Sequence, residues 1–108
     1  MGTATVEVSG KDVARWAAEL QATLVANARS GDSVSPVELQ RSAEVVIAVI
    51  GLVFTGVETA RTIWDWWQSR KPEGCKVRIL VPDGTQVDVS VVGEAELEIV
   101  FQRAASHR

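Results

Sequence analysis

The sequence predicts an α+β fold, with a short, mostly antiparallel sheet and helices packed on one of its faces. Two stretches near the ends of the chain, residues 3–8 and 75–91, alternate apolar and polar side chains as strands do. Between them, apolar residues recur at helical spacing. The expected order is strand, helix, very short strand, long helix, two strands and helix, within a single domain of 108 residues.

The first strand is expected over residues 3–8, because its alternate side chains are apolar: Ala4, Val6 and Val8. Ser9 and Gly10 then turn the chain, and either Ser9 or Gly10 is placed to cap the helix that follows. Residues 11–29 should form this amphipathic helix, whose apolar face carries Val13, Trp16, Ala17, Leu20 and Leu24. The segment from Ser30 to Pro36 is the clearest loop, and Ser33 to Ser35 can add a very short strand.

The long stretch from Ala43 to Gln68, AEVVIAVIGLVFTGVETARTIWDWWQ, organises the rest of the chain. Its apolar residues recur at alternating spacings of four and three, which is the pattern of a helix seam: Val46, Ile50, Val53, Val57, Ala60, Trp64 and Trp67. We therefore expect a long core helix that begins near Pro36 and has Gly51 and Gly56 at close-packing positions. Its uncharged run is shorter than the roughly 18 to 20 residues of a membrane span.

The helix should end at Lys71-Pro72-Glu73-Gly74, after which the apolar period changes to two. A β-hairpin is expected to turn at Pro82-Asp83-Gly84. Its apolar face carries Cys75, Val77, Ile79, Val81, Thr85, Val87, Val89 and Val91, and its polar face Lys76, Arg78, Gln86, Asp88 and Ser90. The tail, residues 93–106, fits either a strand or a helix, and the helix is favoured because Glu and Ala are helix formers.

The composition narrows the classes of partner. The formal net charge of -3 argues against binding to a nucleic-acid backbone. The single cysteine, Cys75, cannot form an internal disulfide or a cysteine-based zinc site, and the first residues do not resemble a secretory signal. We therefore expect a cytoplasmic protein without a metal or another cofactor.

No catalytic constellation is recognisable. The only histidine, His107, is next to the last residue of the chain, where it is poorly placed to act as a base. Cys75 has no basic partner on its own side of the predicted strand. The glutamates Glu94, Glu96 and Glu98 would spread over different faces of a helix. We therefore expect no catalytic residues and no enzymatic activity.

One cluster combines aromatic and basic side chains near the end of the long helix: Trp64, Trp66 and Trp67 with Arg61, Arg70, Lys71, Lys76 and Arg78. Trp and Arg are enriched in the hot spots of protein interfaces. Trp beside Lys or Arg is also typical of a helix on a membrane surface. A third interpretation places Trp64 and Trp67 in the core, with Trp66 covering the hairpin and the charges forming a solvated rim.

The order of these elements carries a family resemblance. An apolar, glycine-containing helix, EVVIAVIGLVFTG, is expected to end in the Trp-rich, Arg-terminated turn TIWDWWQSRK, which leads to the hairpin VRILVPDGTQVDVS and a final short helix. In these features the sequence resembles the effector-associated constant component family. Its members are small α+β proteins inferred to be non-enzymatic parts of bacterial conflict and defence systems. The family offers no catalytic residues to carry over.

The resemblance implies an adaptor or sensor-side component encoded beside variable effectors, which are often proteases or peptidase-like proteins. We therefore expect an interaction module that docks on a separate effector protein through the surface near the end of the long helix. The alternative is a membrane-associated or self-assembling component, a homo-oligomer that uses the apolar helix as its seam.

Overall fold

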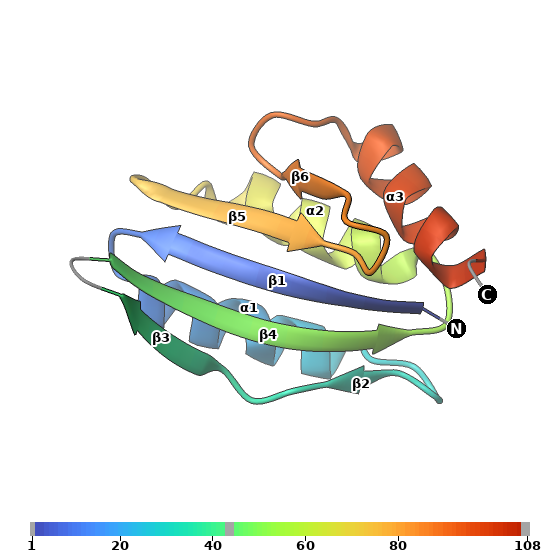
Figure 1. The fold of residues 1–108 in the computed structure, drawn as a ribbon, viewed down its shortest axis with the longest axis horizontal. Helices are drawn as coiled ribbons and strands as arrows, with labels where there is room; N and C mark the ends of the chain where they lie inside the picture. The colour runs from blue at the N-terminus through green and yellow to red at the C-terminus, as the bar shows by residue number, and fades with distance from the viewer. Residues whose placement is uncertain (1, 43–44, 107–108) are drawn as a thin grey trace.

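The computed structural model describes residues 2–42 and 45–106. In this part of the chain six strands form one antiparallel sheet, and three helices cover one of its faces (Figure 1). The elements are β1 (Gly2–Gly10), α1 (Val13–Ala26), β2 (Ser33–Val34), β3 (Glu38–Ser42), β4 (Val45–Phe54), α2 (Glu58–Arg70), β5 (Cys75–Leu80), β6 (Gln86–Asp88) and α3 (Glu94–Ser106). The predicted fold class, an α+β arrangement with helices on one side of the sheet, is confirmed.

The strand order is β2-β4-β1-β5-β6, and β3 pairs with β4 beside β2. The first strand of the chain is therefore central, because β1 pairs with both β4 and β5. The hairpin of β5 and β6 and the helical tail are confirmed. The second strand is shorter than predicted, because it ends at Asp88 and Val91, expected on the apolar face, is 80% exposed in the turn that follows.

The prediction of one long helix over Ala43 to Gln68 is wrong in its first half. Residues 45–54 form the longest strand of the sheet, and only the second half of the stretch, from Glu58, is helical. Six of the ten residues of β4 are Val or Ile. Such β-branched side chains lose rotamer freedom in a helix and pack well on a pleated sheet. A nearly continuous apolar run also satisfies the helical and the strand period alike, so its spacing could not decide between them.

The predicted helix start at Pro36 is also wrong, because this segment forms an edge of the sheet. The Ser35 hydroxyl accepts a 2.7 Å hydrogen bond from the backbone N–H of Gly51, and the Ser35 N–H donates to the Gly51 carbonyl at 2.9 Å. A Cβ atom at Gly51 would lie 3.4 Å from the Ser35 hydroxyl oxygen. Gly51 therefore permits a close approach, as expected, but between strand segments and not between helices.

The strands place alternate side chains on two different faces. The face toward the helices is buried and contains Ala4, Val6 and Val8 of β1, Ala48, Ile50, Leu52 and Phe54 of β4, and Val77 and Ile79 of β5. We call the opposite face, which the helices do not cover, the open face (Figure 1). It carries Thr3, Thr5, Glu7 and Ser9 of β1, Val45, Ile47, Val49 and Val53 of β4, and Lys76 and Arg78 of β5.

The helices form a second layer in which α2 packs between α1 and α3. The Phe54 and Phe101 rings lie 4.8 Å apart between centroids and join β4 to α3 in the core. Within the described residues, no helix is long and apolar enough to cross a membrane.

Candidate interaction surface

The three tryptophans of α2 have different environments. Trp66 is buried, with only 4% of its surface exposed, whereas Trp64 and Trp67 are half-buried against the core. The interpretation in which Trp66 covers the hairpin is therefore wrong, because Trp66 points toward α1. Its ring meets that of Trp16 edge-on, with centroids 6.2 Å apart.

A carboxylate on α1 holds this aromatic pair in place. The indole N–H of Trp66 donates to Glu19, and the same carboxylate oxygen forms an ion pair with the Arg70 guanidinium. Burial of an indole N–H is favourable only if it finds an acceptor, and Glu19 supplies it. Arg70 is thus tied to α1 but keeps more than half of its side chain exposed.

Arg61 lies away from the end of α2 and serves a different contact. It pairs with Glu94 and Glu98 of α3 at 3.4 and 3.6 Å. With a rise of about 1.5 Å per helical residue, its backbone is roughly 13 Å from that of Arg70 along the axis. Arg61 therefore joins α2 to α3 and does not contribute to a surface at the last turn of α2.

Lys76 and Arg78 project from the open face of the sheet, opposite to the helices. Arg78 lies mid-strand, where its guanidinium is 4.0 Å from the Glu7 carboxylate on the neighbouring strand. The sheet separates Arg78 from Trp64 and Trp67, whereas Lys76 lies near the start of β5, beside the α2–β5 turn. The eight residues expected to form one surface are therefore divided among three places.

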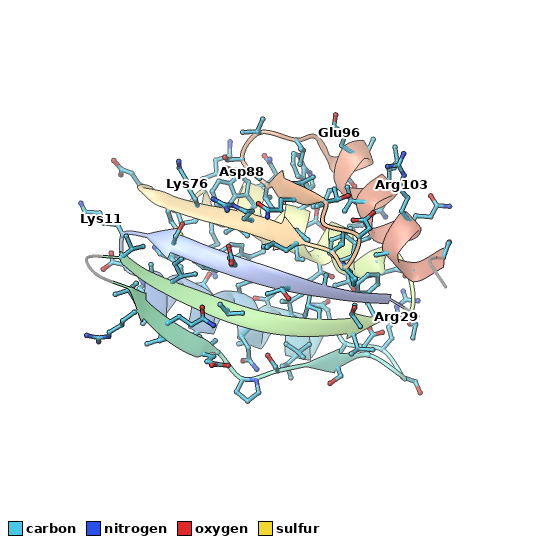
Figure 2. All side chains as sticks on the ribbon, in the orientation of Figure 1. Lys11, Arg29, Lys76, Asp88, Glu96 and Arg103 are labelled. Carbon is cyan, nitrogen blue, oxygen red and sulfur yellow. The ribbon has the colours of Figure 1, made fainter. Side chains whose placement is uncertain are left out.

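The structure adds residues from α1 to the end of α2. The backbone N–H of Lys11 donates a 2.9 Å hydrogen bond to the Gly74 carbonyl, so the β1–α1 turn lies against the α2–β5 turn. Gly10 pairs with Cys75, and Ser9 with Lys76, at the same end of the sheet. The Arg15 guanidinium lies over the Trp16 ring, 4.8 Å from its centroid. Figure 2 shows Lys11 and Lys76 at this end of the molecule.

We call this surface the basic end and define it by five cations and two aromatic rings: Lys11, Arg15, Arg70, Lys71 and Lys76, with Trp16 and Trp67. All five cations are exposed, and both rings are half-buried. Four acidic residues, Asp12, Glu19, Asp65 and Glu73, lie in the same turns and helices, which leaves an excess of one positive charge. Sequence reasoning missed Lys11, Arg15 and Trp16 because they lie about 50 residues or more before the end of α2. Antiparallel pairing of the first strand with Cys75–Leu80 was the signal that could have found them.

Two further features lie outside the basic end. A cavity of about 200 Å³ at the opposite end of the sheet is lined by Gly2, Thr3, Val81, Pro82, Asp83, Arg103 and Ala104. Cys75 is buried, and burial raises the pKa of its thiol. His107 lies outside the described residues.

Comparison of the chain with protein-family models, with curated proteins and with solved structures finds no match.

Proposed function

We propose that this protein is a non-enzymatic, cytoplasmic adaptor of a bacterial conflict or defence system, and that it docks on a separate effector protein through the basic end. The observation that carries the proposal is the meeting of the β1–α1 and α2–β5 turns. This meeting joins two half-buried tryptophans, Trp16 and Trp67, to five exposed cations.

The chemistry of the basic end specifies the partner surface. Trp and Arg are among the side chains that most often dominate binding energy at an interface. The positive excess of the basic end favours a partner whose docking surface is acidic and has an apolar recess for an indole ring. Because the whole chain has a formal net charge of -3, the basic end is a local positive region on an acidic protein. This uneven distribution of charge orients the protein as an acidic partner approaches.

Part of this surface is held rigid before binding. Arg70 is tied to Glu19, and Arg15 is stacked on Trp16, so these side chains lose less conformational freedom when a partner binds. Lys71 ends α2 in a left-handed conformation, with φ of 40°, and its exposed side chain follows the last helical turn.

Co-purification with the products of neighbouring genes tests this proposal. Lys71→Glu combined with Lys11→Glu should weaken capture of the effector at least tenfold, and the wild-type complex should weaken as salt is raised. Arg103→Glu is the control, because Arg103 is also exposed but lies on α3 at the other end (Figure 2). A complex that survives the double lysine variant, or that Arg103→Glu disrupts equally, would contradict docking at the basic end.

A further inference from the structure

The strand β4 is apolar on both of its faces. Its inward side chains, Ala48, Ile50, Leu52 and Phe54, fill the core beneath the helices. Its outward side chains, Val45, Ile47, Val49 and Val53, lie on the open face. Outward positions of an antiparallel strand that faces water are usually polar, whereas a run without alternation is typical of a strand buried on both faces.

The neighbouring strand shows the usual pattern. The residues of β1 paired with Val53, Val49 and Ile47 are Thr3, Glu7 and Ser9. The aliphatic stripe is therefore specific to β4 and does not reflect the composition of the whole sheet. It runs over nine residues from Val45 to Val53, and the eight steps between them give a length of about 27 Å at roughly 3.4 Å per residue. Val45 has 51% of its surface exposed, and Ile47, Val49 and Val53 are half-buried.

The dimensions of the molecule leave room on the open face for a protein interface of standard size. The molecule measures 37 × 27 × 23 Å, and Figure 1 views it down the shortest axis with the sheet across the picture. The two longer dimensions give an upper bound of about 1,000 Å² for the face (37 × 27). A standard interface buries about 800 Å² on each partner.

The charges on the open face favour a second copy of the same chain as the occupant. The face carries three acidic residues, Glu7, Glu38 and Asp88, and two basic ones, Lys76 and Arg78, a net charge of -1. The side chains of Glu7 and Arg78 lie 4.0 Å apart. A surface of mixed sign and near-zero net charge does not repel an identical surface, whereas a nucleic acid or an anionic membrane would require a positive excess. A two-fold interface also brings the same stripe from both copies together.

We propose that two copies of this chain pack their open faces against each other, with the aliphatic stripe of β4 at the centre. The result is a four-layer dimer in which two sheets stack about 10 Å apart and the helices lie outside. Of the basic end, only Lys76 lies on the open face and would be covered in this dimer. Lys11, Arg15, Arg70 and Lys71 lie on the helices and turns, so the dimer leaves them free for effector docking.

Analytical ultracentrifugation of the full chain between 1 and about 500 µM tests the dimer. The wild-type protein should sediment with about twice the 11.7 kDa mass of one chain, and Val45→Lys should weaken the dimer at least tenfold. Val25→Lys is the matched control, because Val25 is also 51% exposed but lies on α1, away from the open face. It should leave the dimer unchanged.

A second variant distinguishes loss of the dimer from misfolding of the chain. Ile47→Thr combined with Val49→Thr keeps β-branched side chains on the strand while it removes apolar surface from the open face. Circular dichroism should show the wild-type spectrum for this variant, and sedimentation should show the monomer.

Three results would overturn the proposal. The first is a wild-type chain that stays monomeric at the highest concentration. The second is a dimer that Val45→Lys and Val25→Lys weaken equally. The third is a dimer that Ile47→Thr combined with Val49→Thr leaves intact. If the wild-type chain is monomeric, flotation with anionic vesicles tests whether the open face binds a membrane, and co-purification tests whether it binds another protein. Loss of that binding in Val45→Lys would assign it to the open face. Lys11→Glu combined with Lys71→Glu should leave the dimer unchanged, so failure of effector docking and failure of dimer formation remain distinguishable.

Discussion

The indole N–H of Trp66 donates a 3.2 Å hydrogen bond to the Glu19 carboxylate, so the buried aromatic ring of α2 is fixed by an acceptor on α1. The same oxygen pairs with Arg70, which couples the last turn of α2 to the middle of α1. One side chain therefore orients both an indole ring of the core and a cation of the basic end.

Replacement of Glu19 should destabilise the protein by a measurable amount. Glu19→Ala removes the acceptor of the Trp66 N–H and should lower the free energy of unfolding by about 1 to 2 kcal/mol. Glu19→Gln keeps an acceptor oxygen and loses only a partly exposed ion pair, so it should recover more than half of that loss. Urea denaturation measures both. Glu96→Ala, at an exposed position of α3, is the control and should change the value by less than about 0.5 kcal/mol. Equal effects of the two alanine variants would show that the Glu19 contact contributes nothing.

The turn between β1 and α1 should be intolerant of a side chain at Gly10. This residue has φ of 106°, and a Cβ atom there would collide with the Gly74 carbonyl oxygen. Gly10→Ala should therefore lower the free energy of unfolding by more than about 2 kcal/mol.

Gly84 supplies a matched control for this substitution. Its φ is 93°, and a Cβ atom there would meet nothing within 4 Å. Gly84→Ala should cost only the strain of the left-handed conformation, about 1 kcal/mol. If both variants lose the same stability in thermal or urea denaturation, the contact between Gly10 and Gly74 has no steric role.

Asp32 should make stability fall in acid. Burial raises its pKa, but hydrogen bonds donated by the Arg29 N–H and by the N–H and hydroxyl of Thr55 outweigh burial and hold the pKa below its ordinary value of 3.8. The unfolded chain therefore binds the proton more tightly than the folded one. The contribution of the Asp32 carboxylate to the free energy of unfolding is complete above pH 3.8. It is lost as the pH falls below that value toward the pKa of Asp32 in the folded protein. Asp32→Asn should show a shallower loss of stability between pH 5 and 2 in acid titrations followed by fluorescence, and an unchanged slope would contradict this role.

Cys75 should resist alkylation in the folded protein. It is 6% exposed, and burial raises the pKa of its thiol, so little thiolate forms near pH 7. Reaction with iodoacetamide should be about a hundredfold slower than in 6 M urea, because it requires local opening of the structure. Mass spectrometry of timed samples measures this ratio, and comparable rates would show that β5 opens readily.

The sequence was sufficient where apolar and polar residues alternate strictly. Val6 and Val8 on β1, and Val77 and Ile79 on β5, lie on the buried face that their spacing predicted. The tail also became a helix, with Glu94 and Glu96 in its first turn as expected.

The sequence was insufficient where almost every residue is apolar. In β4 both faces are aliphatic, so a helical seam through Val46, Ile50 and Val53 could be traced although these residues belong to a strand. The Val and Ile content was the better signal for a strand.

The candidate surface was predicted only in part, because residues distant in the chain complete it. Arg70 and Lys71 keep their place at the end of α2, but Arg61 turns to α3 and Arg78 to the open face. Lys11 and Trp16 join the surface through tertiary contacts that no local pattern contains.

The central position of β1 has a consequence for how the chain folds. This first strand pairs with residues 47–54 on one side and with residues 75–80 on the other. A central strand that waits for partners so far along the chain gives a high contact order, which slows folding. During synthesis β1 stays without its second partner until the ribosome has released Leu80, and the sheet can close only when most of the protein has been made.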